Sequence, residues 1–278
     1  MGIVMTRAEK VFVYLLAFFV LFCLRNPMME LSTWVLTKGN NIACSYKELI
    51  QFFVAFGTLS SVFVALYIAT KNNRRDTFER NFSLLLEQHN DQLKSLLSRK
   101  DFGDKLSSIL GLGSEKDLIS CNKRMHQLDA YYGSYFRVLY YLLKHIDKNY
   151  YGADFLGKKR KFYTSMVRSF LGSEITLLLI INISHGNEEN QYREYRRLIE
   201  KYMYLEHLIL DGDTFASGCS ESVRNGLMLE DSYNTENYVT GLEVLDDICK
   251  EYPISSFGNN DWKKLVLKVK DKNSNGVP

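Results

Sequence analysis

The hydrophobic and polar positions of this chain divide it into a very apolar beginning and a longer amphipathic remainder. The stretch from Leu49 to Thr70 contains no charged side chain, and its one amide side chain is Gln51. The next charged residue is Lys71. As a helix it would be roughly 33 Å long, which is enough to cross the hydrocarbon core of a bilayer. Helices in the cores of soluble proteins rarely run this long without a charge. The pattern therefore predicts a membrane-spanning helix.

A shorter apolar run, Val11 to Leu24, lies nearer the N-terminus and follows Arg7 and Lys10. This pattern also fits a signal peptide, but no small-residue cleavage site follows the run, so we expect a retained first span. With both basic residues inside, and with the basic segment 71–75 behind the second span, the positive-inside rule places both termini in the cytoplasm. The spans then form a hairpin joined by an external loop at 25–48.

From Asp76 onward, apolar residues recur at intervals of three and four, which is the pattern of amphipathic helices. The first apolar face consists of Phe78, Phe82, Leu85, Leu86, His89, Leu93, Leu96 and Leu97. No glycine or proline separates this face from the second span, so one helix is expected to continue out of the membrane. Further helices are expected at about 122–148, 159–184, 190–210 and 238–249, with loops at 101–117 and 211–237. The segment 262–269 fits a strand or a helix.

The predicted fold class is a membrane-anchored all-α protein. It has an N-terminal two-helix transmembrane hairpin over residues 1–75 and a mainly helical cytoplasmic domain over residues 76–278, with a poorly ordered tail from Lys270. The apolar run from Ile175 to Ile183 is too short to span a bilayer and contains Asn182, so it is expected to be a core helix. A net charge of +3 over 278 residues is too small to indicate a nucleic-acid-binding protein overall.

The motifs of common enzyme families are absent from this sequence. It contains no G-x-S-x-G, no H-E-x-x-H and no P-loop, and its five histidines lie far apart in the chain. Its five cysteines show no framework or metal-binding spacing, and the three in the predicted cytoplasmic part are expected to be reduced thiols. We therefore expect no enzyme activity, no cofactor and no metal site.

Small residues recur every four positions in the second span, at Gly57, Ser61, Ala65 and Ala69. A face of this kind lets helix backbones approach closely in lipid. Gly57, Ser61 and Ala65 are therefore candidates for helix packing in the membrane. The partner is either the first span of the same chain or another copy of it, and the sequence leaves both open.

A dense basic run occurs at Lys158, Lys159, Arg160 and Lys161. Its position at a predicted helix start opposes the helix dipole, which suggests an anionic partner. Lipid headgroups, a nucleic-acid backbone and simple solvation all remain open.

Polar residues on apolar helix faces form a second group of candidates, because buried polar groups need hydrogen-bonding partners. His89 lies on the first apolar face and is followed by Asn90. The predicted helix at 159–184 carries three others. We expect a structural or switch-like polar network among His89, Asn90, Arg137, Arg168, Glu174 and Asn182.

Several of these residues also occur in an order that is similar to a known family. The series begins after the two spans with Phe78-x-x-x-Phe82-x-x-Leu85-Leu86-x-x-His89-Asn90 and continues with Tyr135-Phe136-Arg137-x-Leu139-Tyr140, Lys144, Ile146 and Asp147, then Arg168, Glu174, Leu177, Leu178 and Asn182, and finally Leu198-Ile199-Glu200-Lys201-Tyr202. Over about residues 10–210 the chain resembles the putative phage abortive infection proteins of bacteria. Some of these are two-span effectors encoded beside retron reverse transcriptases.

The resemblance implies a toxin of the bacterial inner membrane that stays silent until phage infection and then damages the membrane. In a retron setting its restraining partner would be the reverse transcriptase with its RNA-linked DNA. We therefore expect an antiphage effector that binds membrane lipid, assembles as a homo-oligomer and disrupts the inner membrane. The alternatives are a non-toxic membrane-tethered sensor or adaptor that binds a protein or nucleic acid, and a tethered enzyme that acts on nucleic acid.

Overall fold

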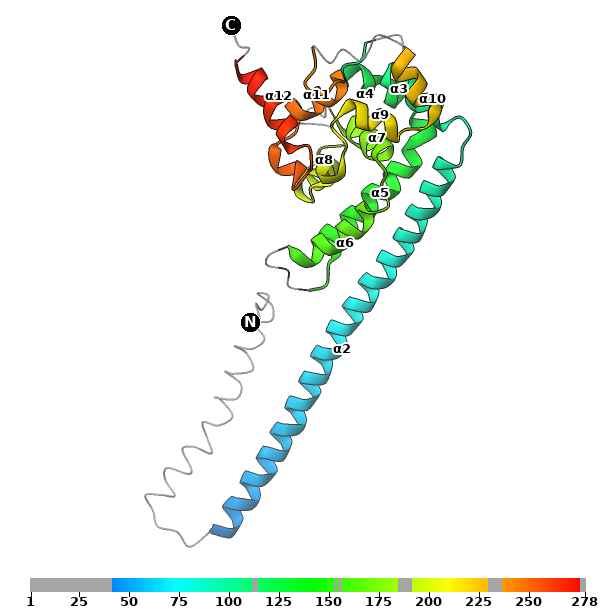
Figure 1. Ribbon diagram of the computed structural model, residues 1–278. Helices are drawn as coiled ribbons and strands as arrows, with labels where there is room; N and C mark the ends of the chain where they lie inside the picture. Colours follow the sequence, from blue (N-terminus) through cyan, green and yellow to red (C-terminus); the bar gives the residue numbers. More distant parts are fainter. Residues whose placement is uncertain are drawn as a thin grey trace. The chain divides into compact units, whose positions relative to one another are not determined.

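The computed structural model describes residues 42–111, 115–152, 154, 157–184, 192–229 and 237–275. Every regular element in these ranges is a helix, and no strand occurs in them, so the all-α class is confirmed (Figure 1). The predicted first span lies outside the described residues, as does most of the predicted external loop. The two-helix hairpin therefore stays a prediction.

Helix α2 (Ile42–Leu97) joins the predicted second span to the first amphipathic helix without a break. The continuation of one helix beyond the apolar stretch is confirmed, and the helix begins within the residues predicted as external loop. From Ile50 onward α2 is the one described helix that is by itself long and apolar enough to cross a membrane. Its most apolar 18-residue window has a mean hydropathy of 2.1, and no residue of that window is buried.

The chain forms two compact units. The first comprises residues 1–79 and 151–156, and the second, which we call the helical unit, comprises residues 80–150 and 157–278. Within the first unit the rings of Phe78 and Tyr151 lie 5.5 Å apart. The predicted division into residues 1–75 and 76–278 stays a prediction.

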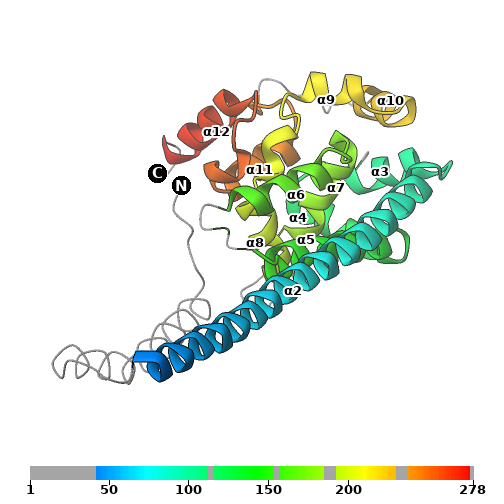
Figure 2. The same ribbon diagram turned by 90° about the horizontal axis from the view of Figure 1, so that it is seen from below.

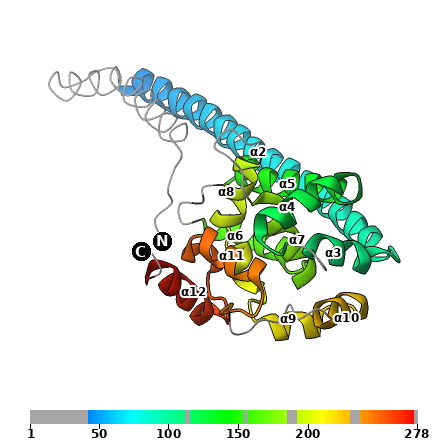
Figure 3. The same ribbon diagram turned by 90° about the horizontal axis from the view of Figure 1, so that it is seen from above.

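The helical unit contains the end of α2 and all the later elements (Figure 2). These are α3 (Phe102–Leu110), α4 (Leu118–Gln127), α5 (Asp129–Asn149), α6 (Lys158–Arg168), α7 (Ser173–Ile183), α8 (Arg193–Lys201), η1 (Tyr204–His207), α9 (Gly212–Gly218), α10 (Glu221–Leu229), α11 (Glu243–Glu251), η2 (Ile254–Phe257) and α12 (Lys263–Asn275). Helix α10 packs on α3, and α11 packs on both α12 and α4 (Figure 3).

Helix α7 lies in the core of the helical unit. All nine residues from Ile175 to Ile183 are buried, and α7 contacts α4, α8 and η1. The prediction of a core helix is therefore confirmed. The last turns of α2 also contribute to this core, because Phe82, His89, Leu93 and Leu96 are buried there, whereas Leu97 is exposed. The ring of Phe82 meets the ring of Tyr163 in α6 at 4.9 Å.

Three of the predicted segments between residues 101 and 184 have wrong boundaries. The predicted loop at 101–117 contains α3, because Gly111 ends a short amphipathic helix as its left-handed C-cap with φ of 76°. The predicted helix 159–184 is two helices, α6 and α7, which are bent by 114° around residues 169–172. The predicted helix 122–148 is also two, α4 and α5, which meet at Leu128.

Later segments are more helical than the sequence indicated. The polar segment 211–237 contains α9 and α10, and the ambiguous segment 262–269 belongs to α12. Residues Lys270–Asn275 continue α12, so the tail is ordered as far as Asn275. Buried Val266 and Val269 explain this helix, since they place its apolar side against the unit.

Candidate functional site

The densest set of polar contacts in the helical unit surrounds α8. This helix has the sequence REYRRLIEK, in which Tyr195, Leu198 and Ile199 are buried at helical spacing. Its charged residues flank that apolar stripe. Glu194, Arg197 and Lys201 of α8 contact side chains of α5. Arg196 contacts Glu251 at the end of α11. The contacts therefore lie at the junction of three helices.

Asp147, near the end of α5, is the first centre of this set. Its carboxylate accepts hydrogen bonds from Arg197 at 2.9 Å, from the hydroxyl of Tyr202 at 2.7 Å, and from the ammonium of Lys201. The Asp147 side chain is only 5% exposed. Burial alone would raise the pKa of Asp147, but the hydrogen bonds from Lys201, Tyr202 and Arg197 hold it well below its usual range. The carboxylate is therefore charged at neutral pH.

Glu194, in the first turn of α8, is the second centre. It accepts a hydrogen bond from the hydroxyl of Tyr140 at 2.6 Å and forms ion pairs with Lys144 at 3.0 Å and Lys148 at 3.6 Å. The bond from Tyr140, with that from Lys144, lowers the pKa of Glu194. A negative charge also suits the start of a helix, where the macrodipole is positive. Together with Asp147, this contact fixes α8 along two turns of α5.

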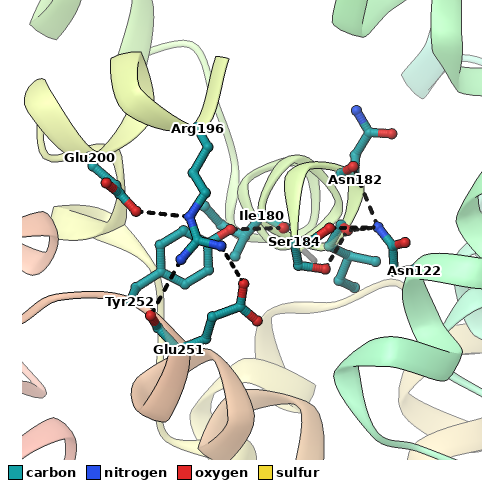
Figure 4. A network of polar contacts seen from close by, with 9 residues as sticks. Asn122, Ile180, Asn182, Ser184, Arg196, Glu200, Glu251 and Tyr252 are labelled. Atoms are coloured by element: carbon teal, nitrogen blue, oxygen red, sulfur yellow. Dashed lines mark hydrogen bonds and ion pairs between the residues drawn. The ribbon is translucent and has the colours of Figure 1, made fainter. Parts of the chain in front are cut away.

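Arg196 is the third centre and connects α8 to the end of α11 (Figure 4). Its guanidinium donates to Glu200 at 2.9 Å and to Glu251 at 2.5 Å, and its Nη2 also donates to the backbone carbonyl of Glu251 at 3.4 Å. The same guanidinium lies 4.6 Å from the centre of the Tyr252 ring. The hydroxyl of Tyr252 donates to the carbonyl of Ile180 in α7 at 3.3 Å. One arginine thus links α8, α11 and the core helix.

The end of α7 is held by Asn122 of α4, which is also drawn in Figure 4. The Asn122 side-chain nitrogen donates to the carbonyl oxygens of Ile181 at 2.6 Å, Ser184 at 3.3 Å and Asn182 at 3.4 Å. The last carbonyls of a helix have no partners within the helix itself. Asn122 therefore satisfies groups that would otherwise be buried without hydrogen bonds.

Arg168, at the end of α6, binds the segment that follows α8. Its Nη2 pairs with Glu206 at 2.7 Å, and its Nη1 donates to the carbonyl of Met203 at 2.7 Å. Met203 has φ of 56°, which is unusual for a residue with a side chain, and its carbonyl is positioned by this contact. Burial would raise the pKa of Glu206, but the charge of Arg168 lowers it below its usual value. The pair closes α6 onto η1.

His89 forms a separate buried contact with α5. Its Nδ1 lies 3.1 Å from Asn90 Oδ1, and its Nε2 lies 3.1 Å from the hydroxyl of Tyr135. Because an amide oxygen only accepts, the proton is on Nδ1 and Nε2 accepts from Tyr135. Burial lowers the pKa of His89, so the ring is neutral at neutral pH. His89 and Asn90, two members of the predicted network, are therefore in contact with each other, and Tyr135 of α5 is the third partner.

The other predicted members of the polar network lie elsewhere. Arg137 is on the surface of α5, where it pairs with Asp129 at 3.5 Å. Glu174 accepts from the backbone of Ser220 at 3.1 Å, and Asn182 is buried with its own carbonyl bound to Asn122. In the described part of the chain, the six predicted residues therefore take part in several separate sets of contacts.

The basic run forms the first turn of α6. Lys158, Lys159 and Lys161 are exposed, and Arg160 is half-buried with its guanidinium 5.9 Å from the centre of the Tyr150 ring. The small-residue face of α2 is exposed as well. A Cβ built on Gly57 meets no described atom within 4 Å, and the Ser61 hydroxyl donates to the Thr58 carbonyl of its own helix at 2.7 Å.

The centres around α8 were not predicted as site residues. Asp147, Lys144, Lys201 and Tyr202 were recognised only as part of the family resemblance, without their pairing. A signal was present, since Asp147 adjoins Ile146 on an apolar face and a charge in such a position needs a partner. The partners come from more than 45 positions away, which helical periodicity does not reveal.

The thiols of Cys121, Cys219 and Cys249 are buried. Burial raises the pKa of Cys121 to about 11 and the pKa values of Cys219 and Cys249 to about 12. They are therefore protonated at neutral pH, and a protonated thiol is a poor nucleophile. Among the described residues, no group of three or more His, Cys, Asp or Glu side chains is arranged to hold a metal ion.

Comparison with known proteins identifies the region that contains these contacts. Residues 128–212 match the family model described as "Putative phage abortive infection protein". No curated protein and no solved structure shows a significant match. The matched residues run from the break before α5 to the first residue of α9, and they include Asp147, Arg168, Glu194 and Arg196. The match over residues 128–212 therefore supports the resemblance to the putative phage abortive infection proteins that was seen in the sequence.

Proposed function

We propose that this protein is a bacterial antiphage effector that is anchored in the inner membrane and, when infection releases it, oligomerises and disrupts that membrane. The observation that carries the proposal is the match of residues 128–212 to a family described by phage abortive infection. The apolar part of α2 supplies the membrane component. The helical unit, which is held together by the contacts of α7 and α8, supplies the part that is restrained before infection.

The membrane component is supported by the exposure of large apolar side chains all around α2. Exposed residues between positions 50 and 68 include Ile50, Phe53, Val54, Leu59, Val62, Phe63, Val64, Leu66 and Ile68. A helix that is apolar on every side belongs in a core or in lipid, and this stretch is not buried in a core. The amphipathic pattern begins only after Lys71, where the charged residues start.

Damage to the membrane requires several chains, because one hairpin cannot enclose water. Lipid provides no hydrophobic drive for helix association, so close packing must hold the chains together. The face of Gly57, Ser61 and Ala65 suits this role, since it is exposed and the Ser61 hydroxyl is already hydrogen-bonded within its own helix. We assign the assembly seam to this face.

The role we assign to the helical unit is restraint and release without catalysis. Its acidic centres, Asp147, Glu194 and Glu206, are paired with cations. The thiols of Cys121, Cys219 and Cys249 are protonated at neutral pH, because burial raises their pKa values. A partner that binds this unit would hold the effector silent. In a retron context the proposed partner is a reverse transcriptase with its RNA-linked DNA.

Induction of the full chain in bacterial cells tests this function. We expect entry of an impermeant dye and loss of membrane potential soon after induction. Replacing Gly57 or Ser61 with Ile should leave membrane abundance unchanged but weaken cross-linking into oligomers and abolish toxicity. Ala55→Ile is the matched control, because Ala55 lies roughly 160° around the helix from Gly57 and gains a similar volume.

The outcomes separate the candidate functions. If the parent chain reaches the membrane but neither dye entry nor loss of potential follows, the effector proposal is wrong and the non-toxic adaptor is favoured. If Gly57→Ile retains both cross-linking and toxicity, the assembly seam lies elsewhere.

Topology needs a separate labelling experiment with an impermeant thiol reagent on cells whose outer membrane is opened. Cys44 should react, because the proposal places it outside. Cys121, Cys219 and Cys249 are buried and cannot report the side of the membrane. An exposed position such as Ser98→Cys serves instead and should react only after the inner membrane is lysed. Reaction at position 98 in sealed cells would reverse the proposed orientation.

A further inference from the structure

The outward face of α6 combines basic residues with an exposed aromatic ring. Phe162 is 62% exposed, the highest value among the large apolar residues of the helical unit whose exposure the structure describes. Lys158 and Lys159 precede it by four and three positions, so they lie beside it on the same face of the helix, and both are exposed. No acidic residue occurs between Asp154 and Glu174, so α6 itself contains basic residues but no acidic ones.

The opposite side of α6 is fixed in the helical unit. Tyr163 meets Phe82 at 4.9 Å, Val167 is buried, and Arg168 is held by Glu206 and the Met203 carbonyl. The hydroxyl of Tyr204 also donates to the Thr164 carbonyl at 3.1 Å. The helix therefore has no freedom to turn Phe162 inward, and this face is held outward by the packing of the unit.

A single exposed phenylalanine is ordinary on a protein surface, but its neighbours here define a particular chemistry. Lysines beside an aromatic ring are the combination found on helices that lie in the membrane interface. The lysines bind anionic headgroups while the ring enters the boundary of the acyl chains. A single-stranded oligonucleotide also offers both features, a backbone for the lysines and bases that stack on the ring, so the choice of lipid rests on the proximity of the membrane anchor.

The chain itself limits how far this face can be from a membrane. Tyr163 of α6 contacts Phe82, and Phe82 follows Lys71 by eleven residues. Even a fully extended segment of that length spans at most about 40 Å. If α2 crosses the bilayer and Lys71 lies at its surface, the α6 face is tethered close to the headgroups at a high effective concentration.

We propose that the outward face of α6, formed by Lys158, Lys159 and Phe162, docks on the anionic lipid surface next to the membrane anchor. This inference rests on the proposed function, since it requires α2 to be in the membrane. Docking gives the helical unit a second attachment, which holds it at the bilayer surface in one orientation. A lysine near an anionic surface increases the docked population about five-fold.

The test uses the full chain carrying Phe162→Trp in nanodiscs. Discs of phosphatidylcholine alone are compared with discs containing phosphatidylglycerol, each made with brominated acyl chains that quench tryptophan. Trp34 and Trp262 contribute the same background to every variant. The measured quantity is therefore the additional quenching relative to the parent chain. We expect it in the anionic discs, and we expect it to fall as salt is raised.

Two matched controls isolate the face. Phe170→Trp places a reporter at another exposed phenylalanine of the same unit, and it should show no additional quenching. The double change Lys158→Glu and Lys159→Glu should reduce the equilibrium constant for docking by at least about 25-fold. The additional quenching of Phe162→Trp should fall accordingly. The same change of charge at exposed Lys264 and Lys268 of α12 should leave it unchanged.

Resistance of the protein to carbonate extraction from cell membranes is measured in parallel, because it reports the anchor independently. Retained anchoring without any lipid quenching of Phe162→Trp would overturn the docking proposal while leaving the proposed function intact. Loss of anchoring would overturn the proposed function and the inference together. Protection of residues 158–162 by an oligonucleotide, without lipid quenching, would assign the face to nucleic acid and also overturn the proposal.

Discussion

Replacing Asp147 with Asn tests whether the contacts around α8 hold the helical unit together. The change keeps the size of the side chain but removes the charge that faces Arg197, Lys201 and Tyr202. The hydroxyl of Tyr202 is buried and loses a charged acceptor, which costs about 1–3 kcal/mol. The two cations lose less, because the Arg197 and Lys201 side chains are 47% and 41% exposed and water can solvate them.

We therefore expect a total destabilisation of about 2–3 kcal/mol for Asp147→Asn. For a unit of this size that corresponds to a decrease in Tm of about 5–10 °C. Thermal unfolding of the full chain in detergent, followed by its helical circular dichroism, measures the shift. Asp129→Asn on the same helix is the control, because its ion pair with Arg137 is exposed and should change stability by no more than about 0.5 kcal/mol.

The pH dependence provides a second readout of the same contact. The folded pKa of Asp147 is lower than the unfolded value of about 3.9, so its contribution to stability is fully present above that value. It is lost as the pH falls through the folded pKa. The stability difference between parent and Asp147→Asn should therefore be constant near neutral pH and should shrink progressively below about pH 4. The reasoning would be refuted if Asp147→Asn destabilised the protein no more than Asp129→Asn does, or if its stability difference from the parent did not change with pH.

Three further predictions follow from single contacts. Asn122→Leu should cost about 1–3 kcal/mol and increase amide exchange at the end of α7, because three buried carbonyls lose their donor; unchanged exchange would contradict this. Gly111→Ala should lower Tm by a few degrees, since φ is 76° and the new Cβ would collide with the Arg124 guanidinium; an unchanged Tm would show that Arg124 moves without cost. Cys121 and Cys249, with pKa values of about 11 and 12, should react with iodoacetamide at neutral pH only after unfolding, and rapid reaction of the folded chain would show that these thiols are accessible.

Helical periodicity in the sequence identified the fold class and the burial of several faces, because those properties depend on neighbouring residues. The face of Phe82, His89 and Leu93 and the core position of Ile175–Ile183 follow from spacing alone. The helix breaks could not be predicted in this way. Leu128 is not a glycine or proline, and the glycines around α3 were interpreted as a loop. Gly111 in fact ends a helix, and glycine is equally typical of both roles.

The contacts of the candidate site were harder to predict from the sequence, because most of them join residues that lie far apart in the chain. His89 and Asn90 are adjacent in the chain, so their partnership was predictable, whereas Tyr135 lies 46 positions away. Arg168 was recognised as needing a partner, but Glu206 is brought to it only by the turn at Met203. Long-range ion pairs depend on how helices cross, which helical periodicity does not reveal, and the bend between α6 and α7 was not predicted either.

The burial of α7 on all sides has a consequence for biosynthesis. As the chain leaves the ribosome, Asn122 and α5 are already made when the apolar run of α7 emerges, but Tyr252, which binds Ile180, is about 70 residues behind. At ordinary translation rates that delay is about 4–14 s. During this interval the nascent chain exposes an apolar segment close to a membrane that has already received α2, if α2 is inserted as proposed. Its shortness keeps the segment from being taken up as a span, and a chain truncated before α11 would keep one side of α7 open to aggregation and proteolysis.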